Sequence, residues 1–325
     1  MKKILTLVLF LLATCQLQAQ ESTTAYSVLR QPTSAHVAAL GGENVATLDD
    51  DPAIVLHNPA LINVVRPGTM GLSFATLPNG GQWLGAQYVH ELGERHTAAA
   101  FAQYMGYGTM TQTDEWGQEL GTFAPKDIIV GGAYSYLLTQ DWAGGVSFKT
   151  LYSSFGLYSA AALAVDLGLN YYDEGKLTSF SIVARNVGAQ IKAYDRRTET
   201  LPFSLQVGFS RRLEHNPLRL HLTLIDLTRW DKQQYYNPTD KALGFGRLAL
   251  NHLVVGADLV LSPSFYLSAG YHFRRAYEMQ TAGKSHWAGL SVGAGLNFHK
   301  LKLNLAWSRQ HLATSSLMGA LAYTF

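Results

Sequence analysis

Residues 300–325 read KLKLNLAWSRQHLATSSLMGALAYTF, and this closing stretch decides the fold. Apolar and polar side chains alternate over residues 301–308 with a period of two, which is the geometry of a strand and not of a helix. After a polar break, a second run places Leu321, Tyr323 and Phe325 on one face and ends on an aromatic ring. A chain end is ordinarily polar and frayed. This end is apolar, so we expect it to be paired in a sheet and to face an apolar environment.

The first residues indicate export. Lys2 and Lys3 precede an uncharged apolar run, and Ala19 offers a cleavage point, so residues 1–19 are predicted to be a secretory signal peptide that is too short to span a membrane. The only cysteine, Cys15, lies inside this leader. Its context loosely resembles a lipoprotein box, which leaves lipidation as an alternative. Ordinary cleavage removes the thiol, and with it any disulfide, thiolate nucleophile or Cys-ligated metal.

Composition narrows the class further. The chain has 25 Lys and Arg against 23 Asp and Glu, and two of the lysines lie in the leader, so the mature chain is formally neutral. A nucleic-acid partner would require a basic excess. Hydrophobic residues make up 47% of the chain, yet no later segment approaches the ~20 consecutive apolar residues of a spanning helix. The apolar residues are therefore interleaved with polar ones, as in a barrel with a lipid-facing exterior and a polar lumen.

Residues 20–67 do not alternate and are rich in small residues and turns. Asp51 before Pro52 predicts an N-cap followed by Pro at the first helical position, so that residues 53–56 form one helical turn. Asn58 before Pro59 predicts a turn. This segment either hangs in the periplasm or folds back as a plug in the lumen. The plug motif consists of Gly41, Gly42, Asp51, Pro52, Asn58, Pro59 and Ala60.

From residue 68 to residue 325 the alternation predicts an all-β, transmembrane, antiparallel up-and-down β-barrel of about 14 strands, preceded by the N-terminal plug. Each strand has the ~9 to 11 residues that a tilted membrane strand needs. The expected strands are 69–78, 82–91, 96–107, 127–138, 141–154, 158–172, 176–188, 202–213, 217–227, 250–262, 264–275, 286–299, 300–310 and 315–325. Leu321, Tyr323 and Phe325 belong to the strand that closes the barrel.

Loop lengths support this interpretation. Every second connection is short, for example residues 299–300 and 262–264, and these are expected to be periplasmic turns. The interleaved set contains the long connections around 108–126, 189–201, 228–249 and 276–285, which are expected to be extracellular. Aromatic residues near strand ends, among them Trp83, Trp142 and Trp307, are expected at the two membrane interfaces. The alternative is that they pack the core of a soluble sandwich.

Several stretches resemble a known family. Residues 38–42, 49–52 and 58–61 are similar to the N-terminal signature of FadL-like outer-membrane barrels. Residues 184–188, 201–203, 226–230 and 270–275 resemble the PorV/PorQ family of the type IX secretion system of Bacteroidetes. The resemblance implies a fourteen-stranded, plugged barrel in the bacterial outer membrane. It also implies a place in the attachment complex for secreted cargo, with PorZ-like, PorU-like and PorV-like protein partners.

Candidate partner residues lie at predicted loop positions. Arg196 and Arg197, and the long loop with Trp230, Tyr235 and Tyr236, form a candidate partner-binding loop, because exposed aromatic and arginine side chains are common at interface hot spots. The alternative for the paired arginines, which recur at residues 211–212 and 274–275, is contact with the membrane interface or with lipopolysaccharide phosphates.

Two sequence patterns that are typical of catalytic or cofactor-binding sites have structural explanations in this chain. Residues 289–293 match Gly-x-Ser-x-Gly, but the match falls within an alternating strand instead of a strand-to-helix turn, so the inward glycines and Ser291 are expected to leave room for a plug. Residues 244–249 mimic a dinucleotide fingerprint without a βαβ unit and are expected to be a loop. We therefore predict no enzymatic activity, no catalytic or cofactor-binding residues and no cofactor.

Asp49, Asp50 and Asp51 are consecutive, whereas a calcium loop uses alternate positions. Asp51 is therefore expected to cap a helix while the other two are solvated, with a bound ion as the alternative. The histidines show no metal spacing. His36 and His57 are candidates to meet inside the plug, and His221, His252, His272 and His299 are expected to face a wet lumen.

Two functions compete. The first is a non-enzymatic anchor that tethers a PorZ-like surface partner for cargo attachment. The second is a FadL-like channel for hydrophobic small molecules, which predicts an apolar pocket inside the barrel and a lateral opening at a kinked strand. The predominance of Ser, Gly, Asn, His and Arg on the inward positions favours the anchor.

Overall fold

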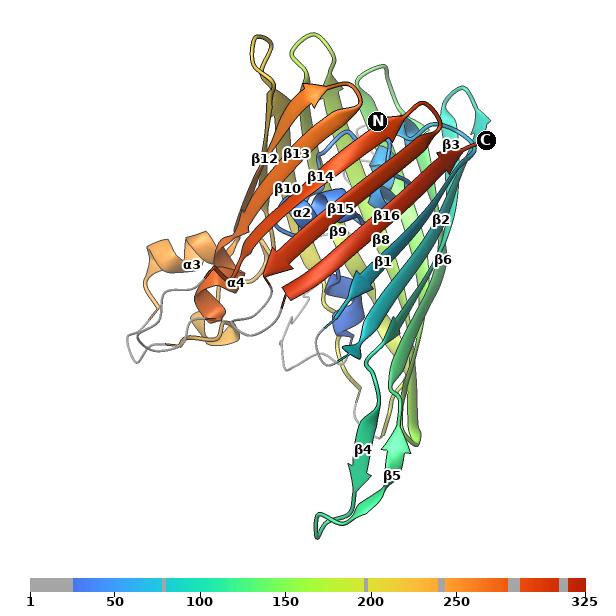
Figure 1. Cartoon of the computed structure of the whole chain (residues 1–325), viewed down its shortest axis with the longest axis vertical. Coiled ribbons are helices and arrows are strands. Elements are labelled where there is room, and N and C mark those ends of the chain that lie inside the picture. The colour runs from blue at the N-terminus through green and yellow to red at the C-terminus, as the bar shows by residue number, and fades with distance from the viewer. Residues whose placement is uncertain (1–25, 78–79, 196–197, 239–242, 280–286, 310–314) are drawn as a thin grey trace, which may run out of the picture.

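The computed structural model describes residues 26–77, 80–195, 198–238, 243–279, 287–309 and 315–325. These residues form a closed antiparallel barrel of fourteen strands, in which neighbours along the chain are neighbours in the wall (Figure 1). The strands are β1 (Thr69–Thr76), β2 (Gln82–Gly93), β3 (His96–Gly106), β6 (Lys126–Leu137), β7 (Trp142–Phe155), β8 (Tyr158–Asp173), β9 (Thr178–Lys192), β10 (Ser204–Arg212), β11 (Leu218–Leu224), β12 (Leu253–Ser262), β13 (Phe265–His272), β14 (Leu290–Phe298), β15 (Leu301–Arg309) and β16 (Ser315–Thr324).

The barrel closes between its first and last strands. In the β1–β16 ladder Thr69 is opposite Thr324, and the hydroxyls of these two residues lie 2.8 Å apart. The backbone N–H of Phe325 donates to the carbonyl of Gly68 at 3.2 Å. The predicted barrel and its closing strand are therefore confirmed, and the apolar chain end is paired on both sides, because β16 also pairs with β15.

Side chains on the two faces of the wall differ as the alternation predicts. Leu321, Tyr323 and Phe325 point outward and are exposed, whereas Met318 and Ala322 on the opposite face are buried. The same outward band of exposed Leu, Phe, Val and Tyr continues over the neighbouring strands. In water such a band would be strongly unfavourable, whereas the lipid of a bilayer covers it at no cost. The protein is a β-barrel of the bacterial outer membrane.

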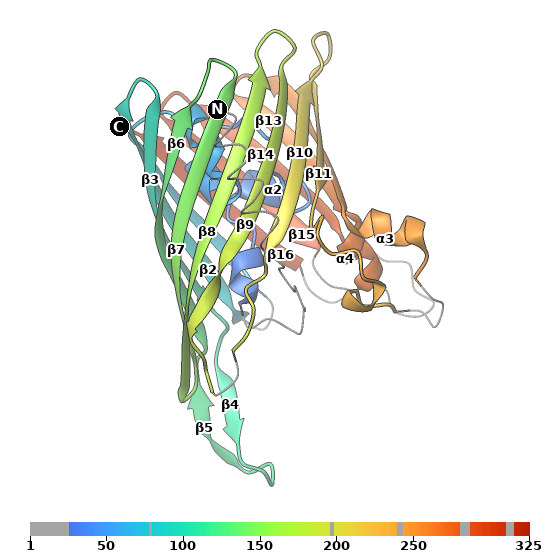
Figure 2. The ribbon, with the colours of Figure 1, turned by 180° about the vertical axis from the view of Figure 1, so that it is seen from behind.

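The described helices are short, and none of them has the length and apolarity to cross a membrane. Four helical turns precede the barrel: η1 (Ser27–Arg30), α2 (Ala35–Ala39), η2 (Pro52–Leu56) and η3 (Pro59–Val64). We call residues 26–65 the inner segment, because nearly all of their side chains are buried within the barrel, where α2 packs on β14 and β15 and η3 packs on β6 and β7 (Figure 2). This location agrees with the expected plug. The predicted leader lies outside the described residues.

The two ends of the barrel differ. One end carries the short turns, such as residues 299–300 between β14 and β15. The other, which we call the long-loop end, carries the hairpin of β4 (Met110–Thr113) and β5 (Glu119–Phe123), which extends beyond the wall (Figure 1). It also carries η5 (Lys232–Gln234), α3 (Phe245–Asn251) and α4 (Phe273–Glu278). The expected sorting of connections by length is therefore present.

Some local expectations are wrong. Residues 244–249 begin a helix, α3, where a loop was expected. Strand β13 ends at His272, because His272 caps α4 through its side chain. Trp83 is fully buried on the inner face of β2, where its indole N–H is 3.4 Å from Gln103 Oε1, and so does not lie at a membrane interface. The position along the strand suggested an interface, but strand parity directs this side chain inward.

Candidate functional site

The inner segment packs directly against glycines of the barrel wall. A Cβ atom added to Gly270 would lie 2.1 Å from the backbone carbon of Leu40, and one added to Gly145 would lie 2.3 Å from the backbone nitrogen of Ala60. No side chain fits at such distances, so the wall and the inner segment touch through their backbones. Glycines on seven strands have an atom of the inner segment, from its backbone or a side chain, where a Cβ would lie: Gly71, Gly145, Gly168, Gly208, Gly256, Gly270 and Gly293.

The plug motif forms the turns that fit this surface. Gly41 and Gly42 follow α2 with φ values of 101° and 91°, which place them in a conformation that favours glycine. The side chain of Asp51 caps η2 by accepting from Ala53 N, and that of Asn58 caps η3 by accepting from Ala60 N. The predicted Asp51 cap is therefore found, Asn58 caps a helical turn where only a turn was predicted, and Pro52 and Pro59 each open a helical turn.

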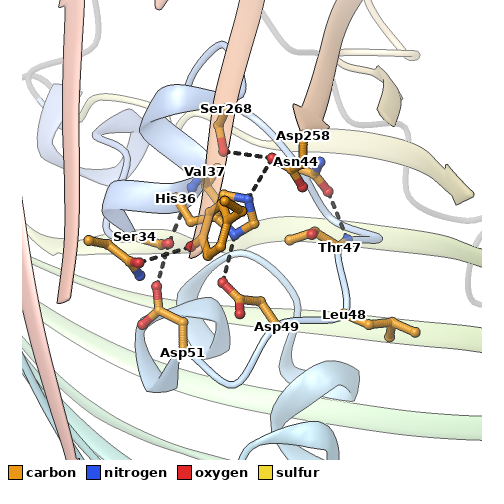
Figure 3. A network of polar contacts seen from close by, with 12 residues as sticks. Ser34, His36, Val37, Asn44, Thr47, Leu48, Asp49, Asp51, Asp258 and Ser268 are labelled. Carbon is orange, nitrogen blue, oxygen red and sulfur yellow. Dashed lines mark hydrogen bonds and ion pairs between the residues drawn. The ribbon is translucent and has the colours of Figure 1, made fainter. Parts of the chain in front are cut away.

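A buried network of charges joins the inner segment to the wall (Figure 3). His36 of α2 contacts Asp49 through Nδ1 at 2.6 Å and Asp258 of β12 through Nε2 at 3.0 Å. A carboxylate can only accept hydrogen bonds, so both ring nitrogens must donate and His36 is an imidazolium. It carries its positive charge between two buried carboxylates and thereby ties the inner segment to β12.

The network continues on the wall. Asp258 also accepts from His221 at 2.9 Å and from Ser268 at 2.6 Å, and it pairs with Arg219 at 2.6 Å. Lys302 of β15 pairs with Asp49. Opposite charges are therefore matched where water is excluded, which is the condition under which a buried ion pair persists.

These contacts correct several expectations. Asp49 is ion-paired and almost buried instead of solvated, and Asp50 pairs with Arg66. The His36 ring lies 6.5 Å from the His221 ring, and the Nε2 atom of His57 accepts from Thr33 N, so each histidine of the inner segment has a partner other than the one expected. His221, His252 and His272 are buried, not wet, and His299 is exposed in a short turn. The inward position of His221 was predicted correctly, and its ring lies near that of His36 of the inner segment, whereas His252 packs against Trp230 and Tyr235 of the long loop.

The residues that match a sequence pattern for catalysis have a structural place in the barrel wall. Ser291 is fully buried on β14, opposite Gly270 in the β13–β14 ladder, and not on a strand-to-helix turn. Gly289, with φ of 88°, precedes the strand. Within the part of the chain that the structure describes, no group of three or more His, Cys, Asp or Glu residues is arranged to hold a metal ion.

A pocket of about 450 Å³ opens at the long-loop end, at the extremities of β3, β6, β7, β8 and β9. Its lining is largely aromatic and comprises Tyr107, Asp127, Ser153, Phe155, Tyr158, Tyr194 and Asp195. This volume falls within the range of about 300–1,000 Å³ that is common for small-molecule sites.

A hydrogen-bond chain fixes the walls of this aromatic pocket. Tyr107 donates to Asp127 at 2.6 Å, Ser153 donates to the other oxygen of Asp127, and Tyr194 donates to Ser153. Burial raises the pKa of Tyr107 and of Tyr194, so both phenols remain protonated donors. Tyr107 also contacts the start of the inner segment, because its hydroxyl lies 3.4 Å from the Ser27 hydroxyl.

The sequence interpretation missed this pocket. Tyr107 had been assigned to a membrane interface with the other aromatic residues near strand ends. The available signal was that Tyr107, Phe155, Tyr158 and Tyr194 all fall at the same end of consecutive strands. Sequence spacing does not show that their rings converge.

The candidate partner-binding loop is only partly exposed. Trp230 and Tyr236 are 44% and 66% exposed, whereas Tyr235 is 6% exposed and donates through its hydroxyl to the carbonyl of Arg229 at 2.8 Å. Trp230 stacks on Phe245 of α3. Arg196 and Arg197 lie outside the described residues. We call Trp230, Tyr236, Phe245 and Leu250 the aromatic platform.

A larger hollow of about 880 Å³ lies on the outer wall. It is lined mainly by exposed outward side chains, such as Leu72, Leu305 and Leu321. Because these residues belong to the lipid-facing band, the hollow is part of the membrane surface and is distinct from the aromatic pocket.

Comparisons with known proteins agree with this geometry. No protein-family model and no curated protein matches the sequence. Among solved structures, the Pseudomonas putida toluene transporter TodX has a TM-score of 0.57 and 14% identity, over 90% of this chain and 98% of TodX. The CymD monoaromatic hydrocarbon channel has a TM-score of 0.55 and 13% identity, over 90% of this chain and 97% of CymD. A Pseudomonas aeruginosa FadL homologue has a TM-score of 0.53 and 10% identity, over 90% and 98%.

The fold is that of the FadL-like outer-membrane barrels. Similarity at 10–14% identity shows this shared architecture and does not by itself transfer a ligand. TodX and CymD are a transporter and a channel, not enzymes. Among the described residues, the aromatic pocket and the aromatic platform are two features that are open to a ligand or a partner.

Proposed function

We propose that this protein is a FadL-like outer-membrane channel that receives a small hydrophobic molecule in the aromatic pocket at its long-loop end. The observation that carries the proposal is the pocket itself, with about 450 Å³ bounded largely by aromatic rings, one of which, Tyr107, contacts the start of the inner segment. By the loop-length rule this end is extracellular. A ligand there would contact both the wall and the inner segment, whose displacement is needed for passage through the lumen.

The wall offers a second supporting feature. Between Val165 and Leu167 of β8 the pairing with β9 shifts register, and Asn186 adopts a φ of 57°. A bulge bends a strand and interrupts its ladder locally. Lys149 and Asp166, 2.7 Å apart, fill the irregularity from inside, and Asn186 accepts from Lys149 at 2.7 Å. This is the kinked strand that a lateral exit for an apolar molecule would use.

The test is uptake of labelled toluene and of a labelled long-chain fatty acid into proteoliposomes that contain the purified barrel. We expect saturable uptake of at least one compound by the wild type, and uptake reduced about tenfold by Phe155→Ala, since an aromatic wall of a pocket contributes about 1–2 kcal/mol. The matched control is Phe148→Ala, on the outward face of the same strand, which should transport normally. Uptake equal to that of protein-free liposomes would refute the channel.

The aromatic platform supports a second candidate, the anchor of a type IX attachment complex. Phe245 is 71% exposed and stacks on Trp230, and exposed apolar rings in a folded loop region are typical of protein interfaces. The tagged barrel, purified from outer membranes, would then retain PorZ-like or PorU-like chains, and a Trp230→Ala, Phe245→Ala variant would lose them. Recovery of the barrel without such partners would count against the anchor.

A further inference from the structure

A polar cavity of about 220 Å³ lies between the inner segment, β9, β10 and α4. It is separate from the aromatic pocket and shares no lining residue with it. Its charged lining consists of four arginines and three carboxylates: Arg30, Arg185, Arg274, Arg275, Glu43, Asp226 and Glu278. The inference drawn from it is independent of the proposed channel.

The carboxylates are already engaged by other arginines. Glu43 accepts from Arg185 at 2.8 Å, and the side chain of Arg185 is 4% exposed. Asp226 and Glu278 both accept from Arg274, at 3.0 and 2.9 Å. Burial alone would raise the pKa of Asp226, but Arg30, Arg229 and Arg274 outweigh burial and lower the pKa, so the Asp226 carboxylate stays ionised.

Arg275 differs from the arginines that engage these carboxylates. Among the described residues its guanidinium takes part in no hydrogen bond or ion pair, although its terminal nitrogen approaches to 3.3 Å the site where Gly42 would carry a Cβ. Burial lowers the pKa of Arg275, and only the charge of Glu43 opposes that effect. The Arg275 side chain is half-buried and lines the cavity, so its guanidinium, which keeps its proton in proteins, is open to an anion there.

Further unsatisfied polar atoms surround the same cavity. Arg185 Nε has no hydrogen-bond partner and is inaccessible, and Gln206 Oε1 is likewise unsatisfied. Buried polar atoms are nearly always satisfied by protein, water or a bound group. Arg185 and Arg275 both line the cavity, so an oxyanion in it can accept from the two guanidinium groups.

We propose that this cavity is a binding site for a phosphate group, held by Arg275 and Arg185 between α4 and the inner segment. A planar guanidinium matches two phosphate oxygens, which makes arginine well suited to this ligand. The cavity has room for roughly seven waters at ~30 Å³ each, which is enough for a phosphate or a small phosphate monoester. The bound anion joins a loop helix to the inner segment.

The experiment is equilibrium dialysis of the purified barrel, in chloride buffer and detergent, against labelled inorganic phosphate and labelled glycerol phosphate. We expect saturable binding with a dissociation constant below about 1 mM. Arg275→Gln should weaken it about tenfold or more, through loss of a charged hydrogen-bond donor. Arg212→Gln, which removes an exposed arginine at the end of β10 outside the cavity, should bind like the wild type.

The two ligands distinguish the source of the phosphate. Preferential binding of inorganic phosphate assigns the site to the free ion, and tighter binding of glycerol phosphate assigns it to an organic phosphate such as a headgroup. Arg275→Lys keeps the positive charge but lacks the planar guanidinium that matches two phosphate oxygens. It provides a second folded variant, and we expect its phosphate affinity to lie between those of the wild type and Arg275→Gln. Absence of saturable binding of both compounds to the wild type, or equal binding to wild type and Arg275→Gln, would overturn the proposal.

Discussion

The interface between the inner segment and the wall differs in kind from the long-loop end. At the interface, the inner segment packs directly on the inner-face glycines, and each charge of the His36 network has an opposite partner. At the long-loop end, aromatic rings are exposed, a pocket is open, and the Arg275 guanidinium has no hydrogen-bond partner among the described residues. Satisfied, close-packed groups stabilise a fold, whereas unsatisfied groups are available to ligands. The difference separates the part of the molecule that holds it together from the part that binds.

The sharpest test of the first region is Asp258→Asn. The substitution removes the carboxylate that His36, His221 and Arg219 share, and leaves buried cations uncompensated. We expect a loss of about 3–5 kcal/mol in the free energy of unfolding, the usual cost of breaking a buried pair from one side. Urea titration of the barrel in lipid vesicles measures it. Asp173→Asn, which breaks an exposed pair with Lys176 in a short turn, should leave the midpoint unchanged.

The second test addresses the glycine contacts. Gly270→Ala places a Cβ within 2.1 Å of the Leu40 backbone, so either β13 or α2 must move. Overpacking of this kind costs about 1–3 kcal/mol, and more where backbone must shift. Limited proteolysis should show the inner segment becoming accessible. In Gly319→Ala the new Cβ would lie 3.5 Å from a Leu305 methyl group, an ordinary contact, and the variant should resist protease like the wild type. Equal protease resistance of the two variants would contradict the close contact between Gly270 and the inner segment.

The long-loop end is expected to respond to acid. The pKa of Asp226 is lowered because Arg30, Arg229 and Arg274 outweigh its burial, so its contribution is complete above the ordinary aspartate pKa of about 3.9 and is lost as pH falls through the lower folded value. Protonation releases Arg274 and with it α4. Amide protection factors in α4 should therefore fall in this range while those of β13 persist. In Asp226→Asn they should already be low at neutral pH, and if they are not, Asp226 does not hold the helix.

Much of this architecture could be predicted from the sequence, because the lipid imposes a period of two on every strand. Leu301 against Lys302 shows which side chain is outward before any partner is known. Alternation does not show what an inward side chain touches. His36 and Asp258 are 222 positions apart in the sequence, and the residues around either one do not indicate that the two are in contact. Trp83 shows the same limit. Its place near a strand end suggested a membrane interface, whereas its parity in the strand gives the correct, inward direction.

The candidate sites were less predictable for the same reason. Trp230, Tyr235 and Tyr236 look equivalent as aromatic residues of one long loop, yet Tyr235 turns inward to pack near His252 and Arg274. The pocket of Tyr107 and Tyr194 depends on the convergence of strand ends that are far apart in the sequence. Caps and turns such as Asp51–Pro52 were predictable, because their chemistry is contained within a few residues.

The smallest expected effect distinguishes two adjacent tyrosines of the long loop. Tyr235→Phe removes a hydroxyl that donates to the Arg229 carbonyl in a buried setting, and we expect a loss of about 1 kcal/mol. Tyr236→Phe alters an exposed ring and should not change the unfolding midpoint. The pair is matched in chemistry and differs by one position, so urea titration of both variants isolates burial as the cause. Equal midpoints would mean that the Tyr235 hydroxyl adds nothing measurable to stability and that other contacts hold the loop.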